Sequence, residues 1–409
     1  MAGRTRSQFK RWLSSPPRPH GEIITDRAVS NLELFYDLVY VAVIAQAGQH
    51  LARDVSLQGI AEYVVIFALV WIAWINGSLY VELHGRDDGR TRLLVFFQMG
   101  ILALLAVFTA DANGANGPGF ALAYAAFLAL MAWNWNGVRK LDREVRPEFL
   151  PITGAYVVAM VASVVLLGGS AFLPADTRIL VWLLYAALWV VGILFADSRP
   201  RPGAARGVVA TNSLVERLDL FTIIVLGEVI VGVVAGLSSV ERDLLTIATG
   251  SLGLIVGFGF WWLYFDLIGG RMPRGEGGAL GRWMLSHLPI TMSIAAAGAG
   301  MLGLIEQAAD AVTPTGTAWL IAGAVAVGLV ALIVAARQLL DAERLADVYR
   351  PLVPALAAGA AVALLAGWAK PAPWLLAALL VAILSAIWFF AVSRFIRADA
   401  WGKPIADSR

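Results

Sequence analysis

The chain has 409 residues, of which 59% are hydrophobic and only 15% are charged, and its mean hydropathy is +0.74. Soluble domains are typically about 45–50% apolar and about 25% charged, so this composition excludes an ordinary water-soluble protein. The absence of cysteine excludes disulfides, cysteine-ligated metals and thiol nucleophiles. We therefore expect an all-α, polytopic transmembrane helix bundle.

Apolar runs long enough to cross a bilayer recur along the whole chain. A spanning helix needs roughly 20 mostly apolar residues, because the hydrocarbon layer is about 30 Å thick. The expected spans, about twelve in number, are residues 32–50, 59–82, 93–111, 119–138, 150–169, 178–196, 214–237, 244–268, 284–305, 316–336, 351–369 and 373–393. Acidic residues lie at the start of the first and seventh predicted spans, so the number of spans depends most on these two.

The basic residues fall mainly on one side of the predicted spans. Of the 31 Lys and Arg residues, 26 lie on one side and four on the other, while Arg217 lies within a span. The positive-inside rule then places both termini in the cytoplasm and favours an even number of spans. We expect a disordered cytoplasmic tail at 1–26 and a short cytoplasmic tail at 399–409.

The chain also contains an internal repeat, with corresponding residues at offsets of mostly 182 or 184 positions. The pairs are Asp37 with Asp219, Gln46 with Glu228, Tyr80 with Tyr264, Glu82 with Asp266 and, more weakly, Gln98 with His287. Because each half holds six predicted spans, both halves should insert in the same orientation, as in parallel-repeat transporters. We predict a first six-helix repeat at 27–206 and a second at 207–398.

Glu228 stands out among the polar residues of the spans, because it lies near the middle of its predicted helix between apolar runs. A charge at the bilayer centre costs ~2.5–3.5 kcal/mol on insertion scales, so it needs a specific reason. Glu228 is a candidate proton- or cation-binding carboxylate; the alternative is a hydrogen-bonded packing residue. Asp219 lies on the opposite face of that helix. The GxxxG spacing of Gly232 and Gly236 favours close helix packing.

Other acids lie nearer the cytoplasmic ends of the spans. Glu33 and Asp37 share a helix face and are candidates to line a cytoplasmic entry. For Glu33 and Glu216, an equal alternative is a role at a helix start, where acids cap free amides and suit the helix dipole. Asp37 and Asp219 lie deeper, so we expect each to have a specific partner, such as Arg217 or a group on another helix.

The second helix of each half ends in an acid that is followed by glycine and arginine. These acids form either a structural latch with Arg86, Arg271 or a neighbouring arginine, or a cytoplasmic gate. The latch or gate candidates are Tyr80, Glu82, Arg86, Tyr264, Asp266 and Arg271. His287 and its counterpart Gln98 are either packing residues or part of a binding site.

Two motifs resemble a known family. Residues Glu33–Leu34–Phe35–Tyr36–Asp37–Leu38–Val39–Tyr40–Val41 resemble the amino-terminal signature of the bacterial low-temperature-requirement A (LtrA) family, and residues 216–228 resemble its second signature. That second motif usually reads Glu-Arg-Phe-Gly-Leu-Phe in the family, whereas Leu218 and Asp219 replace Phe-Gly here. The resemblance implies a polytopic bacterial inner-membrane protein, associated by name with growth in the cold, but it supplies no substrate.

These observations favour a secondary transporter or ion-translocating protein. The alternative is a non-transporting scaffold or cold- or stress-adaptation protein that acts on lipids or partner proteins. An enzyme is disfavoured, because the sequence lacks GxxxxGK[ST], HExxH and GxSxG motifs and its four histidines are scattered. We expect no metal, cofactor or nucleic-acid partner. The expected partners are the lipid bilayer and a small ion or solute, and a homo-oligomer is left open.

Overall fold

The computed structural model describes residues 12, 15–22, 24, 27–198, 209–275 and 278–398. Long α-helices dominate this part of the chain, together with one short 3-10 helix, η1 (Pro147–Phe149). The long helices are α2 (Asn31–Arg53), α3 (Leu57–His84), α4 (Gly89–Thr109), α5 (Gly117–Val145), α6 (Leu150–Ser170), α7 (Ala175–Ser198), α8 (Asn212–Ser239), α9 (Leu244–Leu267), α10 (Ala279–Glu306), α11 (Thr315–Ala336), α12 (Ala346–Ala369) and α13 (Pro373–Arg397).

Each predicted span lies on one of these helices, so the prediction of an all-helical membrane protein is confirmed. Within the described residues, eleven helices are long and apolar enough to cross a membrane. Helix α2 is not among them, and its first two turns carry the acidic residues Glu33 and Asp37. The count of twelve spans and the six-helix repeats stay predictions.

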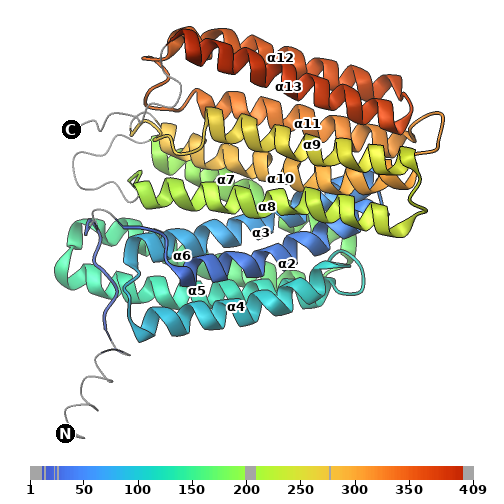
Figure 1. Cartoon of the computed structure of the whole chain (residues 1–409). Coiled ribbons are helices and arrows are strands. Elements are labelled where there is room, and N and C mark those ends of the chain that lie inside the picture. Colours follow the sequence, from blue (N-terminus) through green and yellow to red (C-terminus); the bar gives the residue numbers. More distant parts are fainter. Residues whose placement is uncertain are drawn as a thin grey trace, which may run out of the picture. The chain divides into compact units, whose positions relative to one another are not determined.

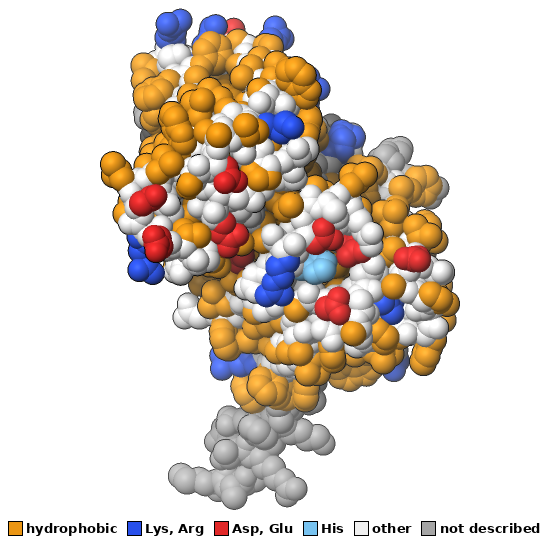
Figure 2. All heavy atoms as spheres, turned by 90° about the vertical axis from the view of Figure 1, so that its right-hand side faces the viewer, with side chains coloured by type: hydrophobic (Ala, Val, Ile, Leu, Met, Phe, Trp, Pro, Cys, Tyr) orange, Lys and Arg blue, Asp and Glu red, His pale blue; other side chains and the backbone are white. Residues whose placement is uncertain are grey.

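Large apolar side chains cover the outer surfaces of the helices. On α4, for example, Phe96 is 66% exposed, Leu104 57% and Val107 65%. Hydrophobic side chains also make up much of the surface in Figure 2, which looks onto one end of the helices. Apolar surface on this scale is unusual for a monomer in water. It suits a lipid environment, in which helices satisfy their own backbone hydrogen bonds.

The described residues divide between two compact units. Unit 1 comprises those within 1–47, 65–195 and 199–214, and unit 2 those within 48–64, 196–198 and 215–409. Both units therefore take residues from α2, α3, α7 and α8. These boundaries differ from the predicted repeat boundaries at 27–206 and 207–398, which a division by compactness does not test.

In unit 1, α5 packs between α4 and α6, and these helices lie side by side in Figure 1. The hydroxyl of Tyr124 on α5 donates to the carbonyl oxygen of Leu69 on α3 at 2.8 Å. The indole of Trp182 on α7 donates to the Ser170 hydroxyl at the end of α6 at 3.0 Å. Buried polar groups of aromatic side chains thus tie several helices of unit 1 to one another.

Residues 15–22 also pack against unit 1, which differs from the expectation of a disordered tail through residue 26. Arg18 is 2% exposed, and its Nε donates to the carbonyl oxygen of Gly85, just after α3, at 2.7 Å. His20 contacts the buried carboxylate of Asp142 on α5 at 2.9 Å. Arg18 therefore satisfies carbonyl groups that the end of α3 leaves free. Apart from residues 12 and 24, the remainder of the predicted tail lies outside the described residues.

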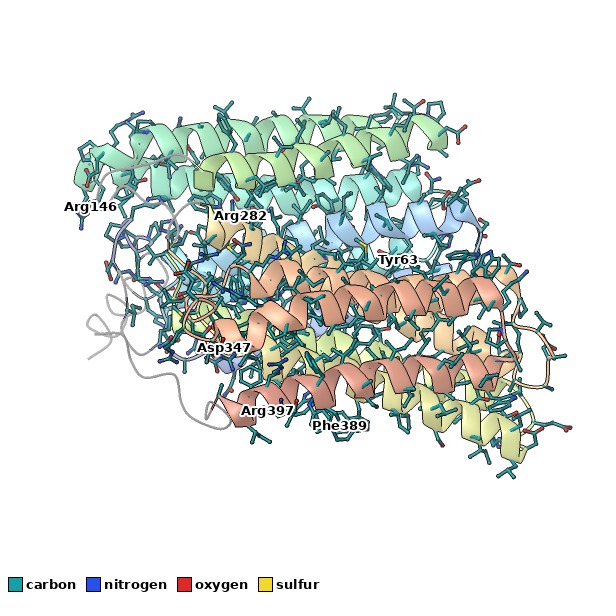
Figure 3. All side chains as sticks on the ribbon, turned by 90° about the horizontal axis from the view of Figure 1, so that it is seen from above. Tyr63, Arg146, Arg282, Asp347, Phe389 and Arg397 are labelled. Atoms are coloured by element: carbon teal, nitrogen blue, oxygen red, sulfur yellow. The ribbon has the colours of Figure 1, made fainter. Side chains whose placement is uncertain are left out.

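In unit 2, α10, α11 and α12 pack one after the other, and α13 packs on both α12 and α9. Helix α9 begins at an N-cap, where Asp243 accepts the backbone N–H of Thr246 at 2.7 Å. Because hydrogen bonds from Thr246 stabilise the carboxylate, the pKa of Asp243 is lowered. Basic and acidic residues, including Arg282, Asp347 and Arg397, lie at one end of these helices (Figure 3).

The backbones of α8 and α10 approach each other closely at two glycines. A Cβ atom on Gly232 would lie 2.1 Å from the carbonyl oxygen of Gly298, and one on Gly298 would lie 2.5 Å from the carbonyl oxygen of Glu228. A Cβ on Gly236, one turn further along α8, would lie 2.9 Å from the Cβ of Ile305. The GxxxG spacing thus forms the α8 side of a close helix crossing.

This crossing predicts that Gly298→Ala destabilises the protein. The added methyl group can be accommodated only if the two backbones move apart, which should lower the free energy of unfolding by about 1–3 kcal/mol. The matched control is Gly323→Ala on α11, where an added Cβ meets no atom within 4 Å. Unfolding in mixed micelles should distinguish the two variants, and equal stabilities would contradict the close crossing.

Candidate functional site

The first candidate site surrounds Glu228, in the middle part of α8 within unit 2. Glu228 is 7% exposed, and its Oε1 atom is buried with no hydrogen-bond partner among the described residues. Its Oε2 atom lies 3.9 Å from where a Cβ would stand on Gly48 of α2. The side chain therefore lies next to a position where α2 presents only a hydrogen atom.

Tyr63, in the first two turns of α3, is a polar side chain of unit 2 near Glu228. It is 2% exposed, it lies close enough to Glu228 for the two groups to interact electrostatically, and its hydroxyl donates to the carbonyl oxygen of Met292 on α10 at 2.8 Å. Figure 3 shows Tyr63 set back from the end of unit 2 that carries Arg282, Asp347 and Arg397. The site thus combines a buried carboxyl group, a tyrosine and two glycines, Gly48 and Gly298.

A second polar group in unit 2 joins three of the predicted site residues. The hydroxyl of Tyr264 on α9 lies 2.8 Å from Asp219 Oδ1 on α8 and 3.0 Å from His287 Nε2 on α10. Gly270 has a φ of +69°, which glycine adopts without strain, and its N–H donates to Asp219 Oδ2 at 2.8 Å. Asp219, Tyr264 and His287 therefore form one hydrogen-bonded chain across three helices.

In unit 1, Glu33 and Glu82 share one arginine. Glu33 forms a capping box with Ser30, whose backbone N–H donates to Glu33 Oε2 at 2.9 Å. Arg27 pairs with Glu33 Oε1 at 2.5 Å and also with Glu82. The second oxygen of Glu82 accepts from the hydroxyls of Thr211 and Ser213, at 2.8 and 2.7 Å. Both acids are buried, and the hydrogen bonds of this cluster match a structural role.

Arg86 and Arg271, the predicted latch partners of Glu82 and Asp266, are paired with other residues. Arg86 lies beyond the end of α3 and is paired at the surface with Glu22 at 3.5 Å, whereas Arg27 reaches Glu82 from the chain before α2. Arg271 pairs with Asp341 at 2.5 Å. Asp266 accepts instead from the indole of Trp388 on α13, at 2.6 Å. The arginines that follow Glu82 and Asp266 in sequence are thus directed to other acids.

The remaining candidates have the following contacts and positions. Asp37 is fully buried in unit 1 and accepts from the Trp74 indole at 2.8 Å. Gln98 donates to the sulfur of Met131 at 3.0 Å. The described positions of the others are Gln46, half-buried on α2; Glu216, exposed near the start of α8; and Tyr80, buried and 3.4 Å from an Arg90 nitrogen.

Several residues of these sites were not identified from the sequence. Tyr63 and Asp142 are far in sequence from their partners Met292 and His20, and Arg27 is 55 positions from Glu82. The small residues of α10, Ala295–Gly300, are a signal that could have indicated its close approach to α8. Within the described ranges, no group of three or more His, Asp or Glu side chains is arranged to hold a metal ion.

Comparison with known proteins bears on both units. The family model of the bacterial low temperature requirement A protein (LtrA) matches residues 28–387. A protein of Rhizobium meliloti (strain 1021), described as uncharacterized, is 27% identical over 243 residues, which are 57% of this chain and 57% of that protein. The matched part thus spans little more than half of that relative's length.

The family match covers most of the chain, including both motifs and eleven described helices apolar enough to cross a membrane. The chain belongs to the bacterial low temperature requirement A (LtrA) family of membrane proteins.

Proposed function

We propose that this protein is a secondary transporter or ion-translocating protein in which Glu228 binds the transported or coupled proton or cation. The observation that carries this proposal is the buried Oε1 atom of Glu228, which has no hydrogen-bond partner among the described residues. Gln46, the sequence counterpart of Glu228 in the first half, has no charge. The two halves would therefore contribute unequally to ion binding.

The physical argument rests on the cost of an isolated charge. A carboxylate taken out of water is strongly disfavoured unless it is paired or fully hydrogen-bonded. Glu228 is 7% exposed, and no arginine or lysine among the described residues forms an ion pair with it. Binding of a proton or a small cation neutralises this charge, and release leaves it uncompensated. A group of this kind suits reversible ion binding.

The alternative is a scaffold protein in which Glu228 serves only to hold helices together. A packing carboxyl group should use both oxygen atoms in hydrogen bonds across the helix interface. The unpartnered Oε1 atom favours ion binding over this alternative. A role in cold adaptation follows from the family name alone and is compatible with either function. We also propose that the protein is not an enzyme, because its sequence lacks the catalytic motifs named above.

Transport would also depend on how the helices are arranged in the membrane. We propose twelve spans in two parallel six-helix repeats, located in the bacterial inner membrane with both termini in the cytoplasm. The sequence repeat and the 26-to-four distribution of basic residues support this arrangement.

The test of the ion-binding role is Glu228→Gln in proteoliposomes that contain a trapped pH-sensitive dye. A pH gradient, with sodium or potassium on one side, reports movement of protons and of these cations in exchange for protons. We expect wild-type protein to give flux and Glu228→Gln to reduce it at least tenfold. The amide does not take up a proton at neutral pH, and it has no negative charge to balance a sodium or potassium ion.

The matched control is Glu241→Gln, which removes an exposed acid from the loop between α8 and α9 and should keep wild-type flux. Wild-type flux in Glu228→Gln would show that Glu228 does not bind the ion. Absence of flux from the wild type under all these gradients would favour the scaffold alternative.

The proposed orientation predicts opposite labelling of two introduced cysteines, which the cysteine-free chain makes simple to interpret. The substitutions are Glu148→Cys and Asp310→Cys. Glu148 lies in η1 between α5 and α6, Asp310 lies between α10 and α11, and both positions are exposed. In intact spheroplasts, a membrane-impermeant maleimide should label the cysteine at 310, and the one at 148 only after permeabilisation. Labelling of both positions from outside would contradict the orientation.

A further inference from the structure

The hydrogen-bonded chain in unit 2 has an unusual proton requirement. Tyr264 is 1% exposed and His287 is fully buried, while Asp219 is half-buried. The Tyr264 hydroxyl lies between the other two, 2.8 Å from Asp219 Oδ1 and 3.0 Å from His287 Nε2. Both distances are within hydrogen-bond range.

The outer atoms of the chain have fixed roles. His287 Nδ1 lies 2.8 Å from the carbonyl oxygen of Trp283. Because a carbonyl oxygen can only accept, Nδ1 carries a proton. Asp219 Oδ2 accepts the backbone N–H of Gly270 at 2.8 Å. A proton on Asp219 would therefore be on Oδ1, which faces Tyr264.

The hydrogen bonds at Tyr264 determine how many protons the three side chains must hold. The two hydrogen bonds that meet at the Tyr264 oxygen need two protons, and the hydroxyl group supplies one of them. The second must be on Asp219 Oδ1 or on His287 Nε2. In either arrangement the three side chains together carry no net charge. Without that second proton, one hydrogen bond is lost and a net negative charge is left in a largely buried group.

We propose that Asp219, Tyr264 and His287 form a proton-binding site that holds one exchangeable proton. The proton can move along the chain without any other reactant. The bond from Asp219 Oδ1 to its proton breaks as that proton bonds to the Tyr264 oxygen. At the same time the original O–H bond of Tyr264 breaks, and its proton bonds to His287 Nε2. The half-buried Asp219 is the end at which a proton enters or leaves.

The neighbours of this site come from several elements. Asp219 accepts from Tyr264 of α9 and from the Gly270 amide, and the charged residues Glu216 and Arg217 precede it on α8. His287 faces Tyr264 and the carbonyl oxygen of Trp283 on its own helix. Arg271, which follows soon after α9, is paired with Asp341.

The first half of the chain offers an internal comparison. The sequence counterparts of the three residues are Asp37, Tyr80 and Gln98, and the described contacts do not join them. Asp37 accepts from Trp74, an Arg90 nitrogen contacts Tyr80, and Gln98 donates to Met131. Among the contacts described above, the hydrogen-bonded chain of three side chains belongs to unit 2.

This site is distinct from Glu228, and its proton does not depend on transport. Asp219 and Glu228 are nine residues apart on α8, which corresponds to ~13 Å along the helix. The site would serve proton movement toward Glu228 only if the proposed function holds, but proton binding itself can be measured in protein that shows no flux.

The test uses full-length protein labelled with 15N-histidine in lipid bilayers at pH 7. Nitrogen chemical shifts report which nitrogens of His287 carry protons, and the infrared band of a protonated carboxylic acid reports Asp219. We expect one of two results: a doubly protonated His287 with ionised Asp219, or a protonated Asp219 with a His287 that is protonated only at Nδ1. An ionised Asp219 together with a neutral His287 would overturn the proposal.

Coupling along the chain gives a second measurement. Asp219→Asn should change the nitrogen shifts of His287 in the wild-type background and should have no effect on them in Tyr264→Phe. Unchanged shifts in the first comparison would also overturn the proposal. Glu241→Gln is the control and should leave the shifts as in the wild type. His287→Gln identifies the His287 signals; if this variant does not fold, replacing His20, His50 and His84 in turn identifies them by elimination.

Discussion

The close crossing of α8 and α10 is the constraint on which the environment of Glu228 depends. Gly232 and Gly298 bring the two backbones together, and the carbonyl group of Glu228 itself lies against Gly298. The Glu228 side chain lies beside Gly48 of α2 and is 7% exposed. Small residues of α2, α8 and α10 thus surround a buried carboxyl group.

The fold class could be predicted from the sequence, because a spanning helix requires a long apolar run and leaves a direct signal in composition. The positions of all twelve helices followed from such runs. Helix α2 was predicted as a span, but it carries Glu33 and Asp37 and is not among the described helices that are apolar enough to cross a membrane. Composition also does not reveal the packing of residues 15–22, because the contacts of Arg18 with the end of α3 depend on tertiary structure.

The candidate sites were predictable in part. The acids could be identified because a charge within an apolar run needs a reason, but their partners could not. Arg27 reaches Glu82 across 55 positions, and Trp388 reaches Asp266 across 122. The nearest arginines in sequence, Arg86 and Arg271, bind other acids. The repeat did direct attention to Asp219, Tyr264 and His287, although only their distances reveal one hydrogen-bonded chain.

The central claim is that Glu228 binds a proton or a small cation reversibly. Infrared difference spectra of wild-type protein and Glu228→Gln in lipid bilayers, recorded as pH and then sodium or potassium concentration is changed, test it most directly. We expect a carboxyl band, absent from the variant, that converts between the protonated acid and the carboxylate as the proton or cation is exchanged. A Glu228 band that stays unchanged under all of these conditions would contradict it.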